Sequence, residues 1–197
     1  MKALLTALSI LFCIRCNPCE PFDKEIYPVE THARYFDSMG VARLNKCLKR
    51  YSEPPLDQLD HESYRLYYEH VFSDTTQMMR IGNRHSAYYF IHKKLVPDSD
   101  STMRVSETIE LPLLPQEWEV CKTIIYRNGY WTLPREIDRY GLDGGTYILE
   151  GRRPEADICG KRSYHLVSRW SPKEGAYRQI CDQFLTVMKS IEDRTHK

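Results

Sequence analysis

The fold is decided by two stretches near the C-terminus, Thr146-Tyr147-Ile148-Leu149-Glu150-Gly151-Arg152 and Ser163-Tyr164-His165-Leu166-Val167-Ser168-Arg169-Trp170. Both stretches are rich in the aromatic and β-branched residues that strands favour. The connection between them, residues 153–162, is polar and contains Pro154, which is typical of a loop. The two stretches therefore predict antiparallel strands joined as a hairpin.

A hairpin that is symmetric about this loop pairs Glu150 with His165. Side chains alternate between the two faces of a sheet, so one face then carries the core residues Tyr147, Leu149, Tyr164, Leu166 and Trp170. The other face carries Thr146, Glu150, His165 and Arg169. In this register a carboxylate, an imidazole and a guanidinium lie close together.

Glu150, His165 and Arg169 are therefore the candidate catalytic residues. A Glu–His pair can serve as general acid and base, and Arg169 can stabilise an anionic intermediate. The simpler interpretation is a structural cross-strand pair, which contributes about 0.2 to 1 kcal/mol. We favour the structural interpretation, and a shift of the register by one residue would separate the three side chains.

Upstream of the hairpin, four segments with strand-like composition are separated by short turn signals, and they predict an antiparallel meander over residues 64–72, 75–81, 86–96 and 103–111. Helical spacing of apolar residues predicts two helices, over residues 115–127 and 172–191. Strands followed by helices, without strict alternation, indicate the α+β class. We expect a mostly antiparallel sheet with two or three helices packed on one face.

Four short motifs follow one another in the segments Gly129–Pro134, Gly141–Gly144, Ile148–Gly151 and Tyr164–Pro172. Their order resembles a group of bacterial proteins of unknown function, whose C-terminal half reads FW-x-LP, GLDG-x-x-W-x-LEG and YH-x-V-x-RWSP. Tyr130 replaces the phenylalanine of the pattern and Tyr147 replaces its tryptophan. The resemblance covers about residues 60–190 and implies that this span is one domain, but it implies no activity.

The N-terminus predicts a signal peptide at residues 1–16. Lys2 precedes an uncharged apolar stretch, Ala3–Ile14, which is long enough for a signal core and shorter than the roughly 20 residues that span a bilayer. We expect an exported protein, periplasmic or secreted, with no integral membrane span after signal removal. A buried N-terminal helix is the alternative. Lipid anchoring at Cys13, Cys16 or Cys19 is less favoured, because no small residue precedes any of them.

The remaining chain divides into an N-terminal arm at residues 17–60, with a helix expected over residues 34–49, and a single α+β domain at residues 61–192. Removal of the signal leaves an odd number of cysteines, Cys19, Cys47, Cys121, Cys159 and Cys181, which allows one or two disulfides in an oxidising compartment. Their connectivity does not follow from the sequence. Cys121 lies on the apolar side of its predicted helix and is expected to be an inert core thiol or half of a disulfide.

Composition excludes several classes of partner and cofactor. The net charge is +1 with no run of like charge, so nothing favours binding to nucleic acid. The histidines lack metal-ligand spacing, and Gly141–Gly145 lacks the lysine of a phosphate-binding loop and predicts a turn. We therefore expect no cofactor. Trp118, Trp131 and Trp170 are candidates for a recognition surface, although rings of this size usually lie in the core.

These features favour a non-catalytic binding or interaction module that holds an unknown protein or small ligand. Its partner would bind the open face of the sheet or the 153–162 loop. The alternative is a small hydrolase-like enzyme that uses the Glu150–His165 pair, and a third possibility is a structural protein of the cell envelope. The enzyme interpretation requires Glu150, His165 and Arg169 to share a concave pocket.

Overall fold

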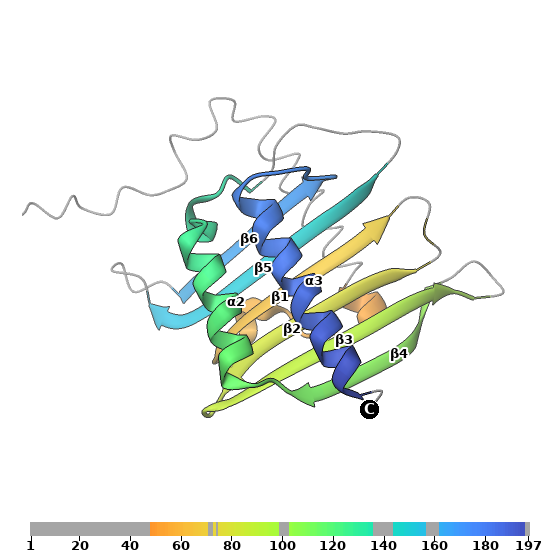
Figure 1. Cartoon of the computed structure of the whole chain (residues 1–197), viewed down its shortest axis with the longest axis horizontal. Helices are drawn as coiled ribbons and strands as arrows, with labels where there is room; N and C mark the ends of the chain where they lie inside the picture. Colours follow the sequence, from red (N-terminus) through yellow and green to blue (C-terminus); the bar gives the residue numbers. More distant parts are fainter. Residues whose placement is uncertain are drawn as a thin grey trace, which may run out of the picture.

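The computed structural model of the chain describes residues 48–70, 73, 75–98, 103–135, 144–156 and 162–195 (Figure 1). The predicted signal peptide at residues 1–16 and most of the helix expected over residues 34–49 lie outside the described residues. Along the chain, the elements are η1 (Leu56–Gln58), β1 (Glu62–His70), β2 (Thr76–Arg84), β3 (Ala87–Pro97), β4 (Met103–Pro112), α2 (Pro115–Arg127), η2 (Tyr130–Thr132), β5 (Gly145–Ala156), β6 (Arg162–Trp170) and α3 (Ala176–Thr195).

The strands form one six-stranded sheet in the order β4-β3-β2-β1-β5-β6. All five pairings between neighbouring strands are antiparallel. The first four strands form a meander, and the β5–β6 hairpin is added beside β1. The meander and the hairpin expected from the sequence are confirmed.

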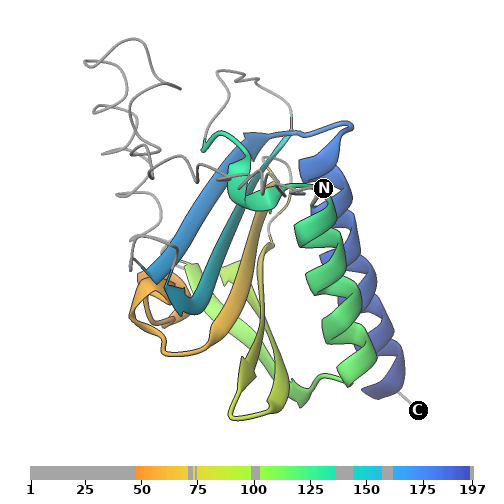
Figure 2. The ribbon, with the colours of Figure 1, turned by 90° about the vertical axis from the view of Figure 1, so that its left-hand side faces the viewer.

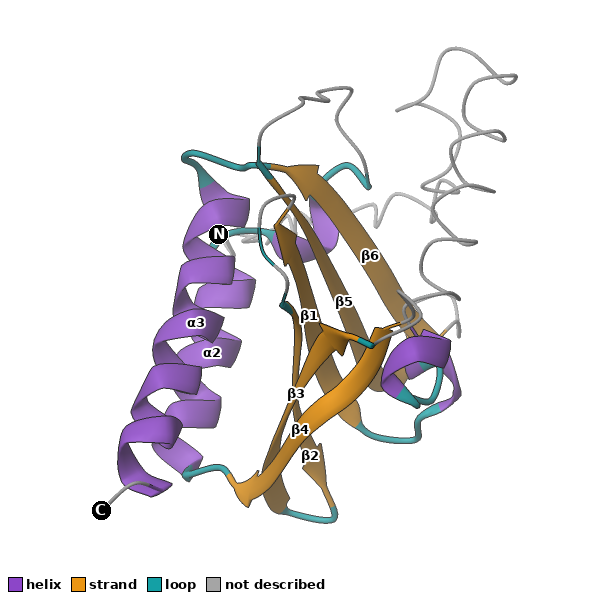
Figure 3. Ribbon diagram, turned by 90° about the vertical axis from the view of Figure 1, so that its right-hand side faces the viewer, coloured by secondary structure: helices purple, strands orange, loops and turns teal. Residues whose placement is uncertain are grey.

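Two helices, α2 and α3, lie side by side on one face of the sheet (Figures 2 and 3). Between them and the strands lies the larger hydrophobic core, which includes Trp118 and Ile125 of α2, Ile180 and Phe184 of α3, and Tyr64, Leu66, Leu149 and Val167 of the sheet. A mostly antiparallel sheet with helices on one face confirms the predicted α+β class. Within the described segments, neither long helix combines the length and hydropathy needed to cross a bilayer.

The ends of α2 follow from local chemistry. Pro115 occupies the first turn, where a missing N–H costs nothing. The Glu117 carboxylate accepts a hydrogen bond of 2.9 Å from the backbone N–H of Leu114 and so caps the first turn. At the other end, Gly129 adopts a left-handed conformation with φ of 60°, which glycine takes without strain and which ends the helix.

The opposite face of the sheet is covered by the N-terminal segment 48–60, which includes η1 (Figures 2 and 3). Leu48, Tyr51 and Leu56 of this segment are buried. Leu48 and Tyr51 belong to a second hydrophobic cluster with Tyr67, Met78, Ile91, Leu95 and Ile148 of the sheet. The centre of the sheet is therefore buried on both faces, and the open face expected from the sequence is in part occupied by the chain itself.

Candidate functional site

The register of the β5–β6 hairpin differs from the prediction by one residue. Glu150 lies opposite Leu166, and His165 lies opposite Gly151. The predicted Glu150–His165 pair is therefore wrong. The cause is an irregularity in the ladder between Arg152 and Ala156, which shifts the pairing next to the loop, so the hairpin is not symmetric about its connection.

The shift separates the three candidate residues onto different faces of the sheet. His165 and Arg169 each lie two residues from Val167 in β6 and so share its face of the sheet. Val167 belongs to the core beneath the helices. Glu150 lies two residues from Ile148 in β5 and so shares its face. Ile148 belongs to the cluster on the opposite face of the sheet. Tyr164 and Leu166 lie on the same face as Glu150, contrary to the prediction that they join the helix-side core. The structure thus brings His165 and Arg169 to one face and leaves Glu150 on the other.

His165 holds the chain that follows η2. Its Nε2 lies 2.9 Å from the carbonyl oxygen of Leu133, so this nitrogen carries the proton and donates. The imidazole also packs against the Tyr130 ring, with 5.1 Å between the ring centres. Burial lowers the pKa of His165 to about 4, which keeps the imidazole neutral near pH 7.

Arg169 holds the same stretch of chain. Its Nη2 donates to the carbonyl of Pro134, and its Nη1 donates to the carbonyl of Arg135 at 3.0 Å. The guanidinium also lies over the Tyr177 ring of α3, 5.4 Å from the ring centre. Both His165 and Arg169 therefore bind backbone carbonyls of residues 133–135, which is a structural role.

Three of the four motifs quoted from the sequence meet at Tyr130. Its hydroxyl donates to the carbonyls of Leu149 and His165, at 3.0 and 2.8 Å. Its ring lies above Gly151, where a Cβ atom would stand 2.6 Å from a ring carbon. The Leu-Glu-Gly and Tyr-His motifs of β5 and β6 thus form the surface against which Tyr130 packs.

Glu150 is sealed on the opposite face, with 1% of its surface exposed. Its carboxylate accepts hydrogen bonds from Arg65 Nε at 2.8 Å and from the Tyr164 hydroxyl at 2.8 Å. Burial raises the pKa of Glu150, and the Arg65 charge acts in the opposite direction. This carboxylate is the counter-ion of a buried arginine.

A second buried carboxylate, Glu53, was not singled out by the sequence. It lies 2.7 Å from Lys93 Nζ, 2.8 Å from Arg80 Nε and 3.4 Å from Arg65 Nη1. The cations come from β3, β2 and β1, so one side chain of the N-terminal segment neutralises charge from three strands. The only sequence signal was the presence of Arg65, Arg80 and Lys93 inside strand patterns.

Two of these cations, together with Arg152, also hold the backbone of the N-terminal segment. Lys93 Nζ donates to the carbonyl of Tyr51 at 2.8 Å, and Arg65 Nη1 donates to that of Pro54 at 2.7 Å. Arg152 Nε donates to the carbonyl of Leu59 at 3.0 Å. We refer to these contacts together with Glu53 as the Glu53 clasp.

An accessible group of aromatic and cationic side chains lies where α2, η2 and the end of β5 meet. The Arg153 guanidinium carbon is 3.9 Å from the ring centre of Trp131 and 5.9 Å from that of Tyr126. Tyr126 is 42% exposed, and Trp131 and Arg153 are partly exposed. We call Tyr126, Trp131 and Arg153 the Arg153 cluster. Two features of the sequence, the 153–162 connection and Trp131, indicate this region.

Two polar hydrogens in the Arg153 cluster have no acceptor within the described part of the chain. Arg153 Nε and Trp131 Nε1 are both buried atoms without a hydrogen-bond partner there. Residues 153–156 belong to β5, which is longer than predicted, and residues 157–161 lie outside the described segments. Of the other tryptophans, Trp118 is a core residue with 1% exposure.

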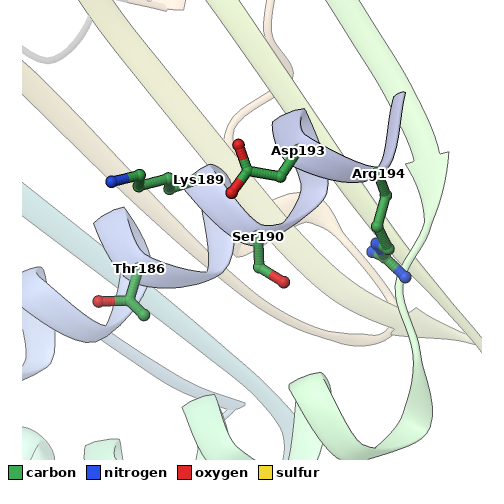
Figure 4. Close-up of a pocket in the computed structure, with 5 residues that line it drawn as sticks. All are labelled: Thr186, Lys189, Ser190, Asp193 and Arg194. Atoms are coloured by element: carbon green, nitrogen blue, oxygen red, sulfur yellow. The ribbon is translucent and has the colours of Figure 1, made fainter. Parts of the chain in front are cut away.

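The structure also has a pocket of about 390 Å³ at the C-terminal end of α3 (Figure 4). Its lining comes from that helix alone and consists of Thr186, Lys189, Ser190, Asp193 and Arg194. Arg194 is already bound to Glu117 at 3.0 Å. A depression formed by one helix surface gives a ligand few convergent groups, so we do not favour it as a site.

The two described cysteines are free thiols in the core. Cys121 and Cys181 are each fully buried, and neither forms a disulfide. Burial raises the pKa of each thiol to about 12, so both stay protonated at neutral pH and are poor nucleophiles. Among the described residues, no group of three potential ligands could hold a metal ion.

Comparison with known proteins adds no assignment, since no family model matches the chain and no match is found among curated proteins.

Proposed function

We propose that the protein is an exported binding module without a catalytic centre, and that it holds its partner at the Arg153 cluster. The observation that supports this most directly is the stacked Arg153–Trp131 pair beside the exposed Tyr126 ring. Arginine, tryptophan and tyrosine are the residue types that dominate binding energy at protein interfaces. Two neighbouring elements, α2 and η2, and the later strand β5 supply them at one accessible place.

The alternative of a hydrolase that uses Glu150, His165 and Arg169 has no supporting contact. Glu150 binds Arg65 and Tyr164, whereas His165 and Arg169 bind carbonyls of residues 133–135. A general acid–base pair must reach a common substrate atom, and two side chains on opposite faces of a sheet cannot do so.

The export part of the proposal rests on the apolar stretch Ala3–Ile14 after Lys2. When the full chain is expressed in a bacterium, we expect the mature protein outside the cytoplasm, beginning near residue 17. Mass spectrometry of the intact protein and N-terminal peptide mapping measure this directly. Recovery from the cytosol with Met1 retained would overturn the export proposal.

The binding part is tested by affinity capture from the envelope fraction of the source cells, with the purified protein immobilised. We expect Tyr126→Ala and Arg153→Ala to reduce capture of a specific partner at least about tenfold, because each removes a central contact side chain. Val120→Ala, on the same helix and 49% exposed, is the control for Tyr126. Arg104→Ala, on β4 with its side chain 58% exposed, is the control for Arg153.

Equal capture by all four variants would refute the Arg153 cluster as the binding surface. Loss in the cluster variants counts only if their thermal unfolding matches that of the controls. The captured partner is then purified and its affinity for the wild-type protein and each variant is measured by calorimetry.

A further inference from the structure

We propose that His92 is a pH sensor for the C-terminal end of α3, and that protonation of its imidazole makes the last turn of this helix leave the sheet. The inference goes beyond the proposed function and does not involve the Arg153 cluster. It depends on three features of the structure: a buried imidazole without a hydrogen bond, the charges that face it, and a helix end that covers it.

The first feature is the environment of the imidazole. His92 of β3 lies two residues from the core residue Phe90, so it shares the face beneath the helices, and its exposed fraction is 0%. Both ring nitrogens are buried atoms without a hydrogen-bond partner in the described part of the chain. A neutral imidazole carries one N–H, and leaving a buried donor unbonded costs about 1 to 3 kcal/mol. Native structures keep few such groups, and a histidine in this state is a candidate for a switch.

The second feature is the set of charges that face His92. Glu192 of α3 places a carboxylate oxygen 3.6 Å from Nδ1, which is beyond hydrogen-bond length. The same carboxylate lies 3.7 Å from Lys94 Nζ, and this amine is bound at 2.9 Å to Glu107 of β4. Glu192, Lys94 and Glu107 are the charged groups that act on the imidazole. The residues directly opposite His92 in the two neighbouring strands are uncharged: Met79 and Ile109.

Protonation of His92 would place a second cation beside Lys94 in this buried site. Burial lowers the pKa of His92, Lys94 acts in the same direction, and the two carboxylates offset these effects only in part. The imidazolium is therefore more stable where water reaches it than beneath the helix. Above about pH 6.5 the imidazole is neutral in both states, and the helix end stays on the sheet. As the pH falls below this value, protons bind preferentially to the open state and increase its population.

The third feature is the helix end itself. The C-terminal end of α3 crosses β3 and comes to its last residue soon after Glu192 (Figure 1). Helix ends open more readily than helix centres, because their last carbonyls lack partners within the helix. The last turn is held by the buried side chain of Ile191 and by the ion pair of Arg194 with Glu117, at 3.0 Å. Its opening admits water to His92 while the rest of α3 remains on the sheet.

Hydrogen–deuterium exchange of the full-length protein, read by mass spectrometry of peptides, tests the proposal. Exchange is measured at pH 7.0 and pH 5.5 and is corrected for the intrinsic pH dependence of amide exchange. We expect protection of residues 188–195 in the wild-type protein to fall about threefold to eightfold at pH 5.5. The upper value belongs to a histidine that titrates with its ordinary pKa in the open state alone. Residues 180–187 should be better protected at both pH values, because the opening is local.

The decisive variant is His92→Leu, which is similar in volume, needs no hydrogen bond and does not titrate. We expect its protection at residues 188–195 to change less than about 1.5-fold between the two pH values. His85→Asn, which removes an exposed imidazole from a turn, is the control and should retain the wild-type response. An equal loss of protection in His92→Leu and the wild-type protein, or no loss in the wild-type protein, would overturn the proposal. Equal protection of residues 188–195 and 180–187 would also overturn it, since the opening would then not be local.

A second variant keeps the test independent of the folding of His92→Leu. Glu192→Gln preserves the shape of a side chain that is 28% exposed and removes a carboxylate that partly offsets the imidazolium. The pKa of His92 beneath the helix should then fall further, so the acid-induced loss of protection should be at least as large as in the wild-type protein. A smaller loss would show that protonated His92 pairs with Glu192 and keeps the helix end closed, which is the opposite of the proposal.

Discussion

At the residue scale, Glu53 couples the N-terminal segment to the sheet. Its carboxylate is 1% exposed as a side chain and faces cations of three strands. Removing one partner of a buried ion pair typically costs about 3 to 5 kcal/mol, because the remaining charges stay buried without compensation. The energetic importance of Glu53 therefore lies in the cations it would leave behind.

We expect Glu53→Gln to lower the free energy of unfolding by about 3 to 5 kcal/mol, since Lys93 and Arg80 would face a neutral amide in a buried position. Urea denaturation followed by circular dichroism measures the loss. Glu107→Gln is the control, because the Glu107–Lys94 pair is partly exposed and should contribute below about 1 kcal/mol. A loss below 1 kcal/mol for Glu53→Gln would show that water compensates these cations.

Gly151 is the other residue with a sharp structural requirement. A Cβ at this position would lie 2.6 Å from Tyr130 and 3.1 Å from Tyr64, both of which are core rings. We expect Gly151→Ala to destabilise the protein by about 1 to 3 kcal/mol through overpacking. Thermal unfolding gives the size of the effect. The double variant with Tyr130→Leu should lose less than the sum of the two single variants, because the clash is shared.

At the element scale, the composition and spacing of side chains were sufficient to predict every long strand and both long helices of the described chain. The predicted helix over residues 115–127 has the bounds of α2, and the final helix begins later than predicted, at Ala176. Periodicity succeeds here because each element must bury a stripe or a face.

The hairpin register was not predictable in the same way. An alternating pattern of apolar and polar residues fixes the register only when one face of a strand is buried and the other is exposed to solvent. In β5, Leu149 packs on the helix side and Ile148 packs against the second cluster, so both faces are buried. Either register then satisfies the pattern, and the irregular ladder after Arg152 decides between them.

The buried hydrogen bond from His165 of β6 to the carbonyl of Leu133 should make the free energy of unfolding depend on pH. The pKa of His165 is about 4 in the folded protein, below the ordinary value near 6.5, so the unfolded chain binds more protons between these values. Stability from this group is complete above about pH 6.5 and is lost as the pH falls toward 4, by about 3 kcal/mol in total.

We therefore expect His165→Asn to show a flatter decline of unfolding free energy between pH 7 and pH 4 than the wild-type protein, because asparagine can donate to Leu133 without titrating. His85→Asn, at an exposed turn position, is the control and should retain the wild-type slope. Denaturation midpoints measured across this pH range decide the question. Parallel curves for the His165 variant and the wild-type protein would contradict the buried neutral imidazole.

At the scale of the whole molecule, the sheet is covered on one face by α2 and α3 and on part of the other face by residues 48–60. The Glu53 clasp joins Glu53 to Lys93, and Leu59 to Arg152 of β5. Such contacts leave no local periodic signal, so the cover over the predicted open face could not be predicted from the sequence. The Arg153 cluster was predicted only as a region, because the contact between Arg153 and Trp131 depends on how η2 lies beside β5.

The buried thiols report on opening of the whole core. Cys121 of α2 and Cys181 of α3 are inaccessible and have a pKa of about 12. We expect both to react with a thiol reagent only when the protein unfolds, so labelling should accelerate steeply across the denaturation transition. Mass spectrometry of the labelled peptides identifies the two sites. Rapid labelling of either cysteine in the native protein would show local opening between the helices and the sheet.

The Glu53 clasp also determines how the molecule responds to mechanical load. Tension applied through the chain ahead of Leu48 is transmitted along residues 48–60 before it reaches β1, and the ion pairs of Glu53 and the carbonyl contacts of Lys93, Arg65 and Arg152 lie along that route. These contacts join the segment to several strands at once, so they share the load in parallel. Pulling on the N-terminus should therefore detach this segment as one unit, with the sheet still intact behind it.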